Sequence, residues 1–173
     1  DISDDAKGYR FRLKRGVTFH NGRELTAEDL KFTLERVSSK KLASWAQSYL
    51  SSVQGFAPFA AGRARQITGI TVRGKYELVL RLSRPDVTIP GVLATPPYYA
   101  LPSREFRAEG GKFPLEAGGT GPYRLAEVDL ARRRYTATRF EDYVYAGQVP
   151  YLDELEWSWG VSQQLQFLRV QRG

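Results

Sequence analysis

Residues 9–37 read YRFRLKRGVTFHNGRELTAEDLKFTLERV, a stretch that combines a strand pattern with a helix pattern. From Tyr9 to Lys14, aromatic and aliphatic residues alternate with cations, and this period of two is typical of a half-buried strand. Gly16 interrupts the alternation, and Asn21-Gly22 is a turn dipeptide. The first part of the stretch therefore predicts a strand followed by a turn.

A helix is predicted to begin directly after Thr26. Thr26 is a good N-cap, and Asp29 takes the place of the glutamate in a capping box. The apolar residues recur at spacings of three and four and so form one face: Ala27, Leu30, Leu34 and Val37. Lys31 and Glu35 have the spacing of an i,i+4 ion pair, which we expect on the outside of this helix.

Strand and helix patterns are mixed along the rest of the chain. Five glycines between residues 110 and 121 mark the best candidate for a domain boundary. Because the elements follow no regular βαβ rhythm, the fold class is α/β in the broad sense, a mixed α+β arrangement. A β-hairpin is predicted over 70–82, short helices at 87–93 and 102–109, further strands at 123–128, 133–140 and 155–159, and a helix at the end.

The composition excludes several kinds of chemistry. The 173 residues include one His, no Cys and no Met. Without Cys there is no disulfide, no thiol nucleophile and no zinc–thiolate site. The chain opens on polar, acidic residues that do not form a signal peptide, and we expect it to be a processed or excised part of a longer protein.

The net charge of +7 has two interpretations. A basic nucleic-acid-binding module would use its cations for phosphate contacts. Alternatively, the cations form an ordinary solvated face. They are dispersed along the chain except for one cluster at residues 132–134, which favours the second interpretation, so we expect no nucleic acid as a partner.

The sequence offers little for catalysis. A catalytic triad would need the sole histidine, His20, as its base, and no Gly-x-Ser-x-Gly elbow supplies a nucleophile. A four-ligand His/Cys metal site cannot be built. We therefore interpret His20 as a turn-stabilising residue and predict no catalytic residue, metal or cofactor. A pair of glycosidase carboxylates stays open, because it depends on a separation in three dimensions.

Residues 118–123 read GGTGPY and resemble a phosphate loop only superficially. No Lys-Ser/Thr pair follows the glycines, and proline removes a backbone donor. We interpret this segment as a structural motif whose glycines permit positive φ: Gly119, Thr120, Gly121 and Pro122.

Taken together, several segments resemble the family 5 extracellular solute-binding proteins, which include oligopeptide, dipeptide and nickel receptors of ABC importers. Their order and spacing match over nearly the whole chain. Two departures put the subfamily in doubt: residues 143–147 replace the family's Tyr-Trp-x-Gly, and Val128 or Asp129 stands where a tryptophan is common. The matching segments are residues 9–22, 25–36, 67–85 and 119–125, followed by 139–145 and 150–153.

The resemblance implies part of a two-lobed, periplasmic-binding-protein-like II fold of the peptide-binding class. Residues 1–116 would form the small subdomain of lobe I and residues 117–173 part of its core, with the second lobe absent. The implied function is capture of peptides or similar solutes for import, without enzymatic activity. The implied setting is the periplasm or cell surface, with a lipid anchor and a membrane permease as partner.

Three tyrosines are expected near a ligand: Tyr49, Tyr98 and Tyr123. Tyr49 belongs to an aromatic-rich stretch that begins at Trp45, and Tyr98 belongs to a Tyr-Tyr pair. Aromatic side chains bury large areas on binding at a low entropic cost. The alternative for each is a place in the subdomain core. The missing lobe is expected to be needed for peptide binding.

Two further expectations accompany this interpretation. The same fold could serve as the solute-sensing domain of a cytoplasmic transcription regulator. A lobe without its closing strands would expose sheet edges and apolar surface, which favours a homodimer of the chain. The identity of the solute stays open, because this fold hosts many specificities.

Overall fold

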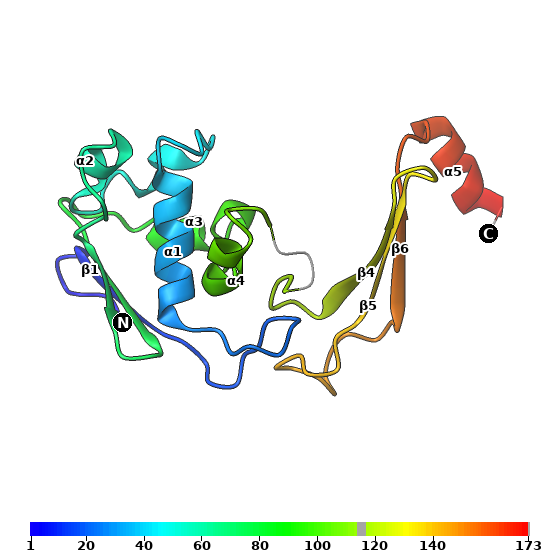
Figure 1. Ribbon diagram of the computed structural model, residues 1–173, viewed down its shortest axis with the longest axis horizontal. Coiled ribbons are helices and arrows are strands. Elements are labelled where there is room, and N and C mark those ends of the chain that lie inside the picture. The colour runs from blue at the N-terminus through cyan, green and yellow to red at the C-terminus, as the bar shows by residue number, and fades with distance from the viewer. Residues whose placement is uncertain (114–116, 173) are drawn as a thin grey trace. The chain divides into compact units, whose positions relative to one another are not determined.

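The computed structural model describes residues 1–113 and 117–172 of the chain. The chain divides into two compact units, unit 1 over residues 1–120 and unit 2 over residues 121–173. The division falls within the glycine-rich segment from which the sequence predicts a boundary. Helices and strands occur in mixed order, as Figure 1 shows, which confirms the α/β fold class in its mixed α+β form.

A three-stranded antiparallel sheet with the order β1-β3-β2 lies in unit 1. Its strands are β1 (Gly8–Arg12), β2 (Ile70–Arg73) and β3 (Glu77–Arg81). Tyr9 and Ile70 both pair with Leu80 of the central strand. The predicted first strand and the predicted hairpin are thus confirmed, and they share one sheet.

One face of this sheet supplies most of the core of unit 1. Leu78, Leu80 and Leu82 alternate along β3 and beyond, and all three are almost fully buried. Tyr9 on β1 is buried beside them, whereas Arg10, Arg12 and Arg81 on the alternate positions are exposed. The period-two pattern in the sequence therefore corresponds to one buried and one solvated face.

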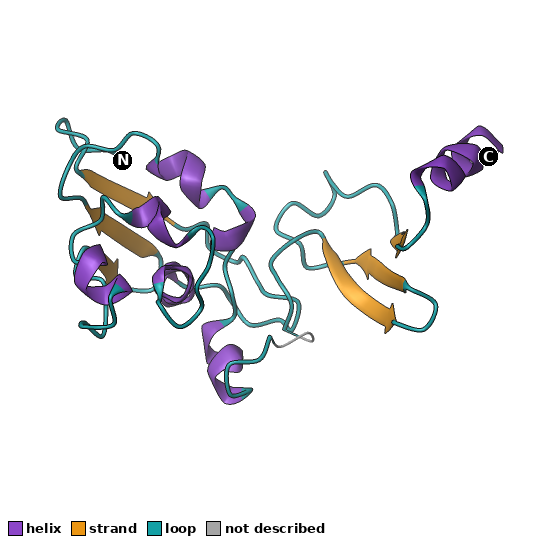
Figure 2. Cartoon of the chain, turned by 90° about the horizontal axis from the view of Figure 1, so that it is seen from above, coloured by secondary structure: helices purple, strands orange, loops and turns teal. Residues whose placement is uncertain are grey.

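The long helix α1 (Ala27–Ser38) packs against β2 and β3. Thr26 is its N-cap, and the Thr26 N–H donates to Asp29 Oδ2 over 3.0 Å, so the predicted capping box is confirmed. The shorter helices of unit 1, which Figure 2 shows around the sheet, are η1 (Gln47–Leu50), α2 (Phe56–Ala60), α3 (Ile89–Leu93), η2 (Pro96–Tyr98) and α4 (Ser103–Ala108).

Lys31 and Glu35 have other partners than the predicted ion pair. Glu35 is half-buried and accepts a hydrogen bond from the Ile67 N–H over 3.0 Å. Lys31 Nζ donates to Gln66 Oε1 over 3.2 Å. The Lys31 charge still favours the charged form of Glu35, but the hydrogen bonds of both side chains go to the segment that leads into β2, which the helix spacing alone does not reveal.

Unit 2 contains an antiparallel sheet with the order β4-β5-β6 and a terminal helix. Its strands are β4 (Tyr123–Asp129), β5 (Arg134–Arg139) and β6 (Glu154–Ser158), and the helix is α5 (Gln163–Arg172). Tyr135 of β5 pairs with Trp157 of β6, and their rings stack with centroids 4.9 Å apart. Within residues 1–113 and 117–172, no helix has the length and apolar character needed to cross a membrane.

Candidate functional site

The most prominent exposed aromatic feature of unit 1 is a pair formed by Trp45 and Tyr49. Their side chains are 72% and 43% exposed, and their rings meet edge to face with centroids 5.7 Å apart. Ala46 and Leu50, on the same segment, are fully buried. Burial of these two residues anchors the segment to the core, so the aromatic pair is presented from a fixed base.

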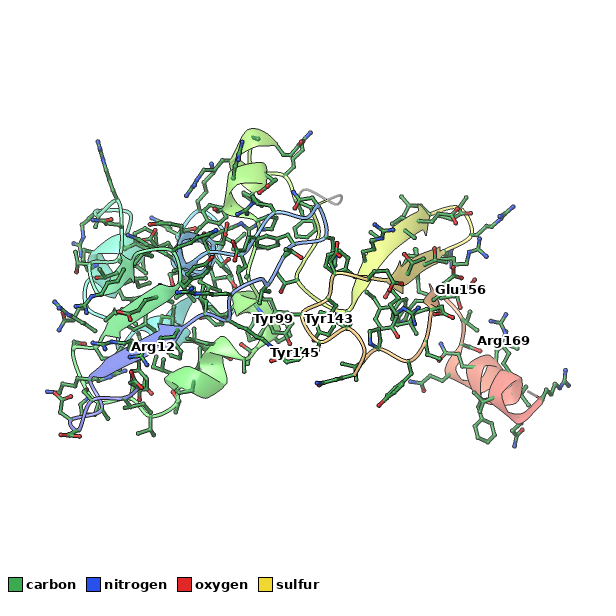
Figure 3. The ribbon with its side chains drawn as sticks, turned by 90° about the horizontal axis from the view of Figure 1, so that it is seen from below. Arg12, Tyr99, Tyr143, Tyr145, Glu156 and Arg169 are labelled. Carbon is green, nitrogen blue, oxygen red and sulfur yellow. The ribbon has the colours of Figure 1, made fainter. Side chains whose placement is uncertain are left out.

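Tyr98 supports this segment from within the core. It is only 3% exposed, and its hydroxyl donates to the Ala46 carbonyl over 2.7 Å. Burial, and to a smaller extent the nearby Tyr49, raise the pKa of Tyr98 to about 12. The structure thus places Tyr98 in the core, which is the alternative that the sequence left open, while its neighbour Tyr99 is 60% exposed (Figure 3).

Tyr123, the third predicted tyrosine, lies at the start of β4 in unit 2. It is half-buried, and its hydroxyl donates to the Leu152 carbonyl over 3.2 Å. A second aromatic pair in unit 2 is formed by Tyr143 and Tyr145, with centroids 5.7 Å apart (Figure 3). This pair stands where the sequence departs from the expected Tyr-Trp motif.

His20 holds the segment that leads into the glycine motif. Its backbone N–H donates to the Ala117 and Gly119 carbonyls over 3.1 and 3.0 Å. The Gly119 N–H in turn donates to His20 Nδ1 over 3.3 Å. Gly118 has a φ of +52°, and a Cβ there would lie 2.4 Å from His20 Nδ1. These contacts support the interpretation of His20 as a structural residue.

The remainder of the motif contributes backbone contacts. The Pro122 carbonyl accepts a hydrogen bond from the Phe140 N–H over 2.9 Å, which joins the start of β4 to the end of β5. Gly121 and Thr120 lie on either side of the division between the two units.

A buried ion-pair network was missed by the sequence reasoning. Asp29 is fully buried and accepts from Arg23 Nη2 over 2.8 Å and from the Ser103 hydroxyl over 2.7 Å. Arg23 Nε also donates to Glu105 Oε1 over 2.7 Å. The contact between Arg23 and Glu105 joins residues that are 82 positions apart in the sequence. The only local signal was Asp29 itself, which the sequence identified as a capping residue.

This network explains why Asp29 stays charged in the core. Burial disfavours its charged form, but the hydrogen bonds from Arg23 and Ser103 outweigh that effect and lower its pKa to about 2. At the surface, hydrogen bonds from Lys75, from the Gly16 N–H and from Tyr76 likewise lower the pKa of Glu24 to about 2. Both carboxylates are therefore held as ion-pair partners of neighbouring cations.

The cationic cluster at residues 132–134 is largely neutralised by neighbours in unit 2. Arg132 lies 3.7 Å from Asp129, and Arg134 Nη1 donates to Glu156 of β6 over 3.2 Å. In the described part of the chain, no group of three or more His, Cys, Asp or Glu residues could hold a metal ion.

Comparison with known proteins identifies the family. The sequence model of the bacterial extracellular solute-binding proteins, family 5 Middle, matches residues 1–173. The chain belongs to the family 5 extracellular solute-binding proteins. The resemblance predicted from the sequence is thereby confirmed.

Several known proteins are similar in sequence to this chain over most of its length. Di/tripeptide-binding protein 4 of Pseudomonas aeruginosa is 29% identical over all of this chain and 33% of its own length. The dipeptide-binding protein of Lactococcus lactis is 26% identical over 84% of the chain and 26% of its own length. The transcriptional regulator SgrR of Salmonella typhimurium is 30% identical over 78% of the chain and 20% of its own length.

Solved structures of family 5 type share the fold. Haemophilus influenzae OppA, in complex with the peptide RPPGFSPFR, matches all of this chain and 34% of its own, with a TM-score of 0.90 and 20% identity. The agropinic acid complex of AgaA from Agrobacterium tumefaciens R10 matches all of this chain and 32% of its own, with a TM-score of 0.83 and 25% identity. The chain thus spans about a fifth to a third of the length of these relatives.

Proposed function

We propose that this chain is part of an ABC-importer receptor that captures peptides outside the cytoplasmic membrane and delivers them to a permease. Family membership supports solute binding, and two relatives carry names that specify di- and tripeptides. The observation that carries the proposal is the exposed pair of Trp45 and Tyr49 on a buried anchor. In this proposal the chain binds a solute without covalent chemistry and is not an enzyme.

The aromatic pair has the physical properties that a promiscuous peptide site needs. Tryptophan and tyrosine have few rotatable bonds, so they contribute contact area at a low entropic cost. Such contacts do not depend on one peptide sequence. Closure of a second lobe over this surface would bury the ligand, and a ligand that binds the closed state better shifts the population toward it.

The arrangement of the receptor follows from the same proposal. Residues 1–116 correspond to the small subdomain of lobe I, and residues 117–173 correspond to part of the lobe core. Tyr49 and Tyr123 lie near the ligand, and Tyr98 acts from beneath Tyr49 through the Ala46 carbonyl. The receptor resides in the periplasm or at the cell surface, is held there by a lipid anchor, and binds its permease in the closed state.

Trp45→Ala and Tyr49→Ala in the full-length receptor test this function. Each truncation removes aromatic contact area, so we expect the affinity for di- and tripeptides to fall about tenfold, by analogy with aromatic hot spots. Isothermal titration calorimetry measures it, with Val87→Ala as the control because Val87 is also exposed and lies elsewhere. Peptide affinities within about twofold of the parent for both aromatic variants would argue against the proposal.

A second candidate function is supported by the regulator relatives. SgrR of Salmonella typhimurium is 30% identical over 78% of this chain. The fold would then sense a solute inside the cell as part of a transcription factor. The flanking sequence separates the two functions, because an upstream helix-turn-helix indicates the regulator and a lipid-attachment cysteine indicates the receptor.

A further inference from the structure

An apolar groove lies on the surface of unit 1 along α1, which contacts both α2 and α4. Its volume is about 520 Å³, within the range of 300–1,000 Å³ that is common for ligand sites. Its apolar lining comes from α1, α2, α4 and the segment after α1: Phe32, Leu42, Phe59 and Phe106. The described helices therefore leave a hollow whose apolar lining is exposed at Leu42, partly buried at Phe32 and Phe59, and buried at Phe106.

Two guanidinium groups lie over aromatic rings that line this groove. The rings of Phe32 and Phe106 are 5.4 Å apart. Arg36 Cζ lies 4.7 Å from the centre of the Phe106 ring, and Arg107 Cζ lies 4.8 Å from the centre of the Phe32 ring. Such cation–π contacts fix the two charges at the edge of the groove.

The groove carries an excess of positive charge. Arg36, Lys41 and Arg65 line it, and the one carboxylate among the lining residues is Glu35. Glu35 already accepts a hydrogen bond from the Ile67 N–H, and burial raises its pKa. The groove therefore presents three lining cations against a single, committed carboxylate.

In the described part of the chain, no carboxylate lies within ion-pair distance of Arg36, Lys41 or Arg65. The same holds for several exposed arginines outside the groove, such as Arg63 and Arg84. The groove is distinguished by the fact that three such cations line one apolar hollow.

We propose that this groove docks an acidic, amphipathic segment of a partner protein. The apolar side chains of the segment would fill the hollow between Leu42, Phe59 and the phenylalanine pair, and its carboxylates would meet the groove cations. Carboxylates suit arginine because the planar guanidinium donates two parallel hydrogen bonds. Charge complementarity of this kind speeds association and fixes the register of the partner.

A nucleic acid is a poorer fit to the same surface. Base recognition on a protein needs exposed aromatic faces for stacking. In this groove Arg36 and Arg107 already cover the faces of Phe106 and Phe32, and Phe106 is buried. Leu42 and Phe59 offer apolar contact without hydrogen-bonding groups, which suits Leu or Phe side chains of a peptide.

The groove is separate from the proposed ligand site. Trp45, Tyr49 and Tyr98 are not among its lining residues. Docking here would leave the aromatic pair available to a solute, so the inference goes beyond the proposed function and survives its failure.

Fluorescence anisotropy with the 173-residue chain tests the proposal. The probe is a short, dye-labelled peptide, blocked at both ends, that alternates Glu with Leu. We expect saturable binding that weakens with salt, because the contacts include exposed charges. Replacing Glu by Gln, or Leu by Ser, in the probe should each weaken binding about tenfold, a change of 1.4 kcal/mol.

Matched variants of the chain locate the site. Lys41 and Arg65 are exposed, so the double substitution K41E/R65E should spare the fold and weaken probe binding by about tenfold or more. Arg63→Glu makes the same charge change as Arg65→Glu alone, two residues away and outside the groove, and should leave affinity within about twofold where Arg65→Glu weakens it. Leu42→Ser tests the apolar part without a change in charge.

Several results would overturn the proposal. One is absence of probe binding, and another is equal binding of the Gln peptide. An effect of Arg63→Glu as large as that of Arg65→Glu would also overturn it, because the attraction would then come from net charge alone. Displacement of the probe by inorganic phosphate or by single-stranded DNA at equal concentration would show a general anion site instead of a peptide-docking groove.

Discussion

Asp29 accepts hydrogen bonds from three separate segments of unit 1. Its donors are Arg23 from the turn before α1, Thr26 from the helix cap, and Ser103 from the start of α4. A carboxylate without access to solvent is tolerated only when such donors replace its hydration. The same side chain therefore caps α1 and joins it to α4, which explains why a short aspartate can occupy the capping position.

Asp29 makes its own contribution to the pH dependence of stability, beside that of surface carboxylates such as Glu24. The pKa of Asp29 is lowered from the ordinary value of 3.8 to about 2 in the folded state, so the folded state favours the charged form. Because the folded pKa is the lower one, this stabilisation is complete above pH 4 and is lost as the pH falls from about 4 to about 2. The expected loss is about 2 kcal/mol in the free energy of unfolding, measured by urea denaturation at several pH values.

Asp29→Asn should remove that contribution to the pH dependence and destabilise unit 1 by about 3 kcal/mol at neutral pH, since Arg23 loses a charged partner. The control is Asp4→Asn, which changes an exposed aspartate and should leave the unfolding curve unaltered. An Asp29→Asn protein that unfolds like the parent at pH 7 would contradict the structural role of this network.

Gly69 and Gly91 differ in the space available for a side chain. A Cβ on Gly69 would lie 2.5 Å from the Arg81 carbonyl oxygen and 2.8 Å from the Gln54 carbonyl oxygen. A Cβ on Gly91, within α3, would meet no atom within 4 Å. Glycine is therefore required at position 69, where neighbouring backbone atoms come close, but not at position 91.

Gly69→Ala should destabilise the protein by about 3 kcal/mol, because the backbone of β3 must move. Gly91→Ala should stabilise it by about 0.5 to 1 kcal/mol, because alanine has the better helix propensity and less freedom in the unfolded chain. Thermal unfolding followed by circular dichroism measures both. The argument fails at either position where the sign of the change is reversed.

At the scale of elements, local sequence patterns predict the helices and hairpins that are stabilised by contacts between nearby residues. The capped helix α1 and the hairpin of β2 and β3 were predictable, since a cap and a period in hydrophobicity are read from adjacent residues. The arrangement of the elements was not. The pairing of β1 with β3 and the contact of Arg23 with Glu105 join residues about 70 and 82 positions apart, and no short-range pattern encodes them.

The candidate site shows the same limit. The sequence singled out the aromatic stretch from Trp45, but it could not decide which tyrosine of the Tyr98-Tyr99 pair would face the core. The two tyrosines are adjacent, between Pro97 and Ala100, so the local sequence hardly distinguishes them. Burial of Tyr98 is decided by the Ala46 carbonyl, which needs a donor and lies 52 residues away. The positive groove was also missed, because its cations come from several segments that appear unrelated in the sequence.

At the scale of the whole molecule, the two units differ in how much core each has. The buried apolar cluster of unit 1 includes residues of α1 and residues of the sheet, among them Leu34, Leu78 and Leu80. In the described part of unit 2, the buried apolar residues are Ala137 and Phe140. Its larger side chains, such as Trp157 and Phe167, remain exposed in this chain. Burial of apolar area is the main favourable term in folding, so unit 2 is expected to be the less stable part.

Native-state hydrogen exchange of the 173-residue chain tests this difference. Amides in the centre of β3 should exchange only on global unfolding of unit 1, whereas amides of β5, also a central strand, should exchange at least about tenfold faster through local opening. The comparison is sound because both strands have two hydrogen-bonded neighbours. The measurement is repeated at two protein concentrations, since self-association through exposed strands and through the exposed apolar side chains of α5, such as Phe167, would slow exchange in unit 2. Equal protection of β3 and β5 at the lower concentration would contradict this expectation. It would show that the few buried residues of unit 2 suffice for its stability, and that the unequal division of the core does not make unit 2 less stable than unit 1.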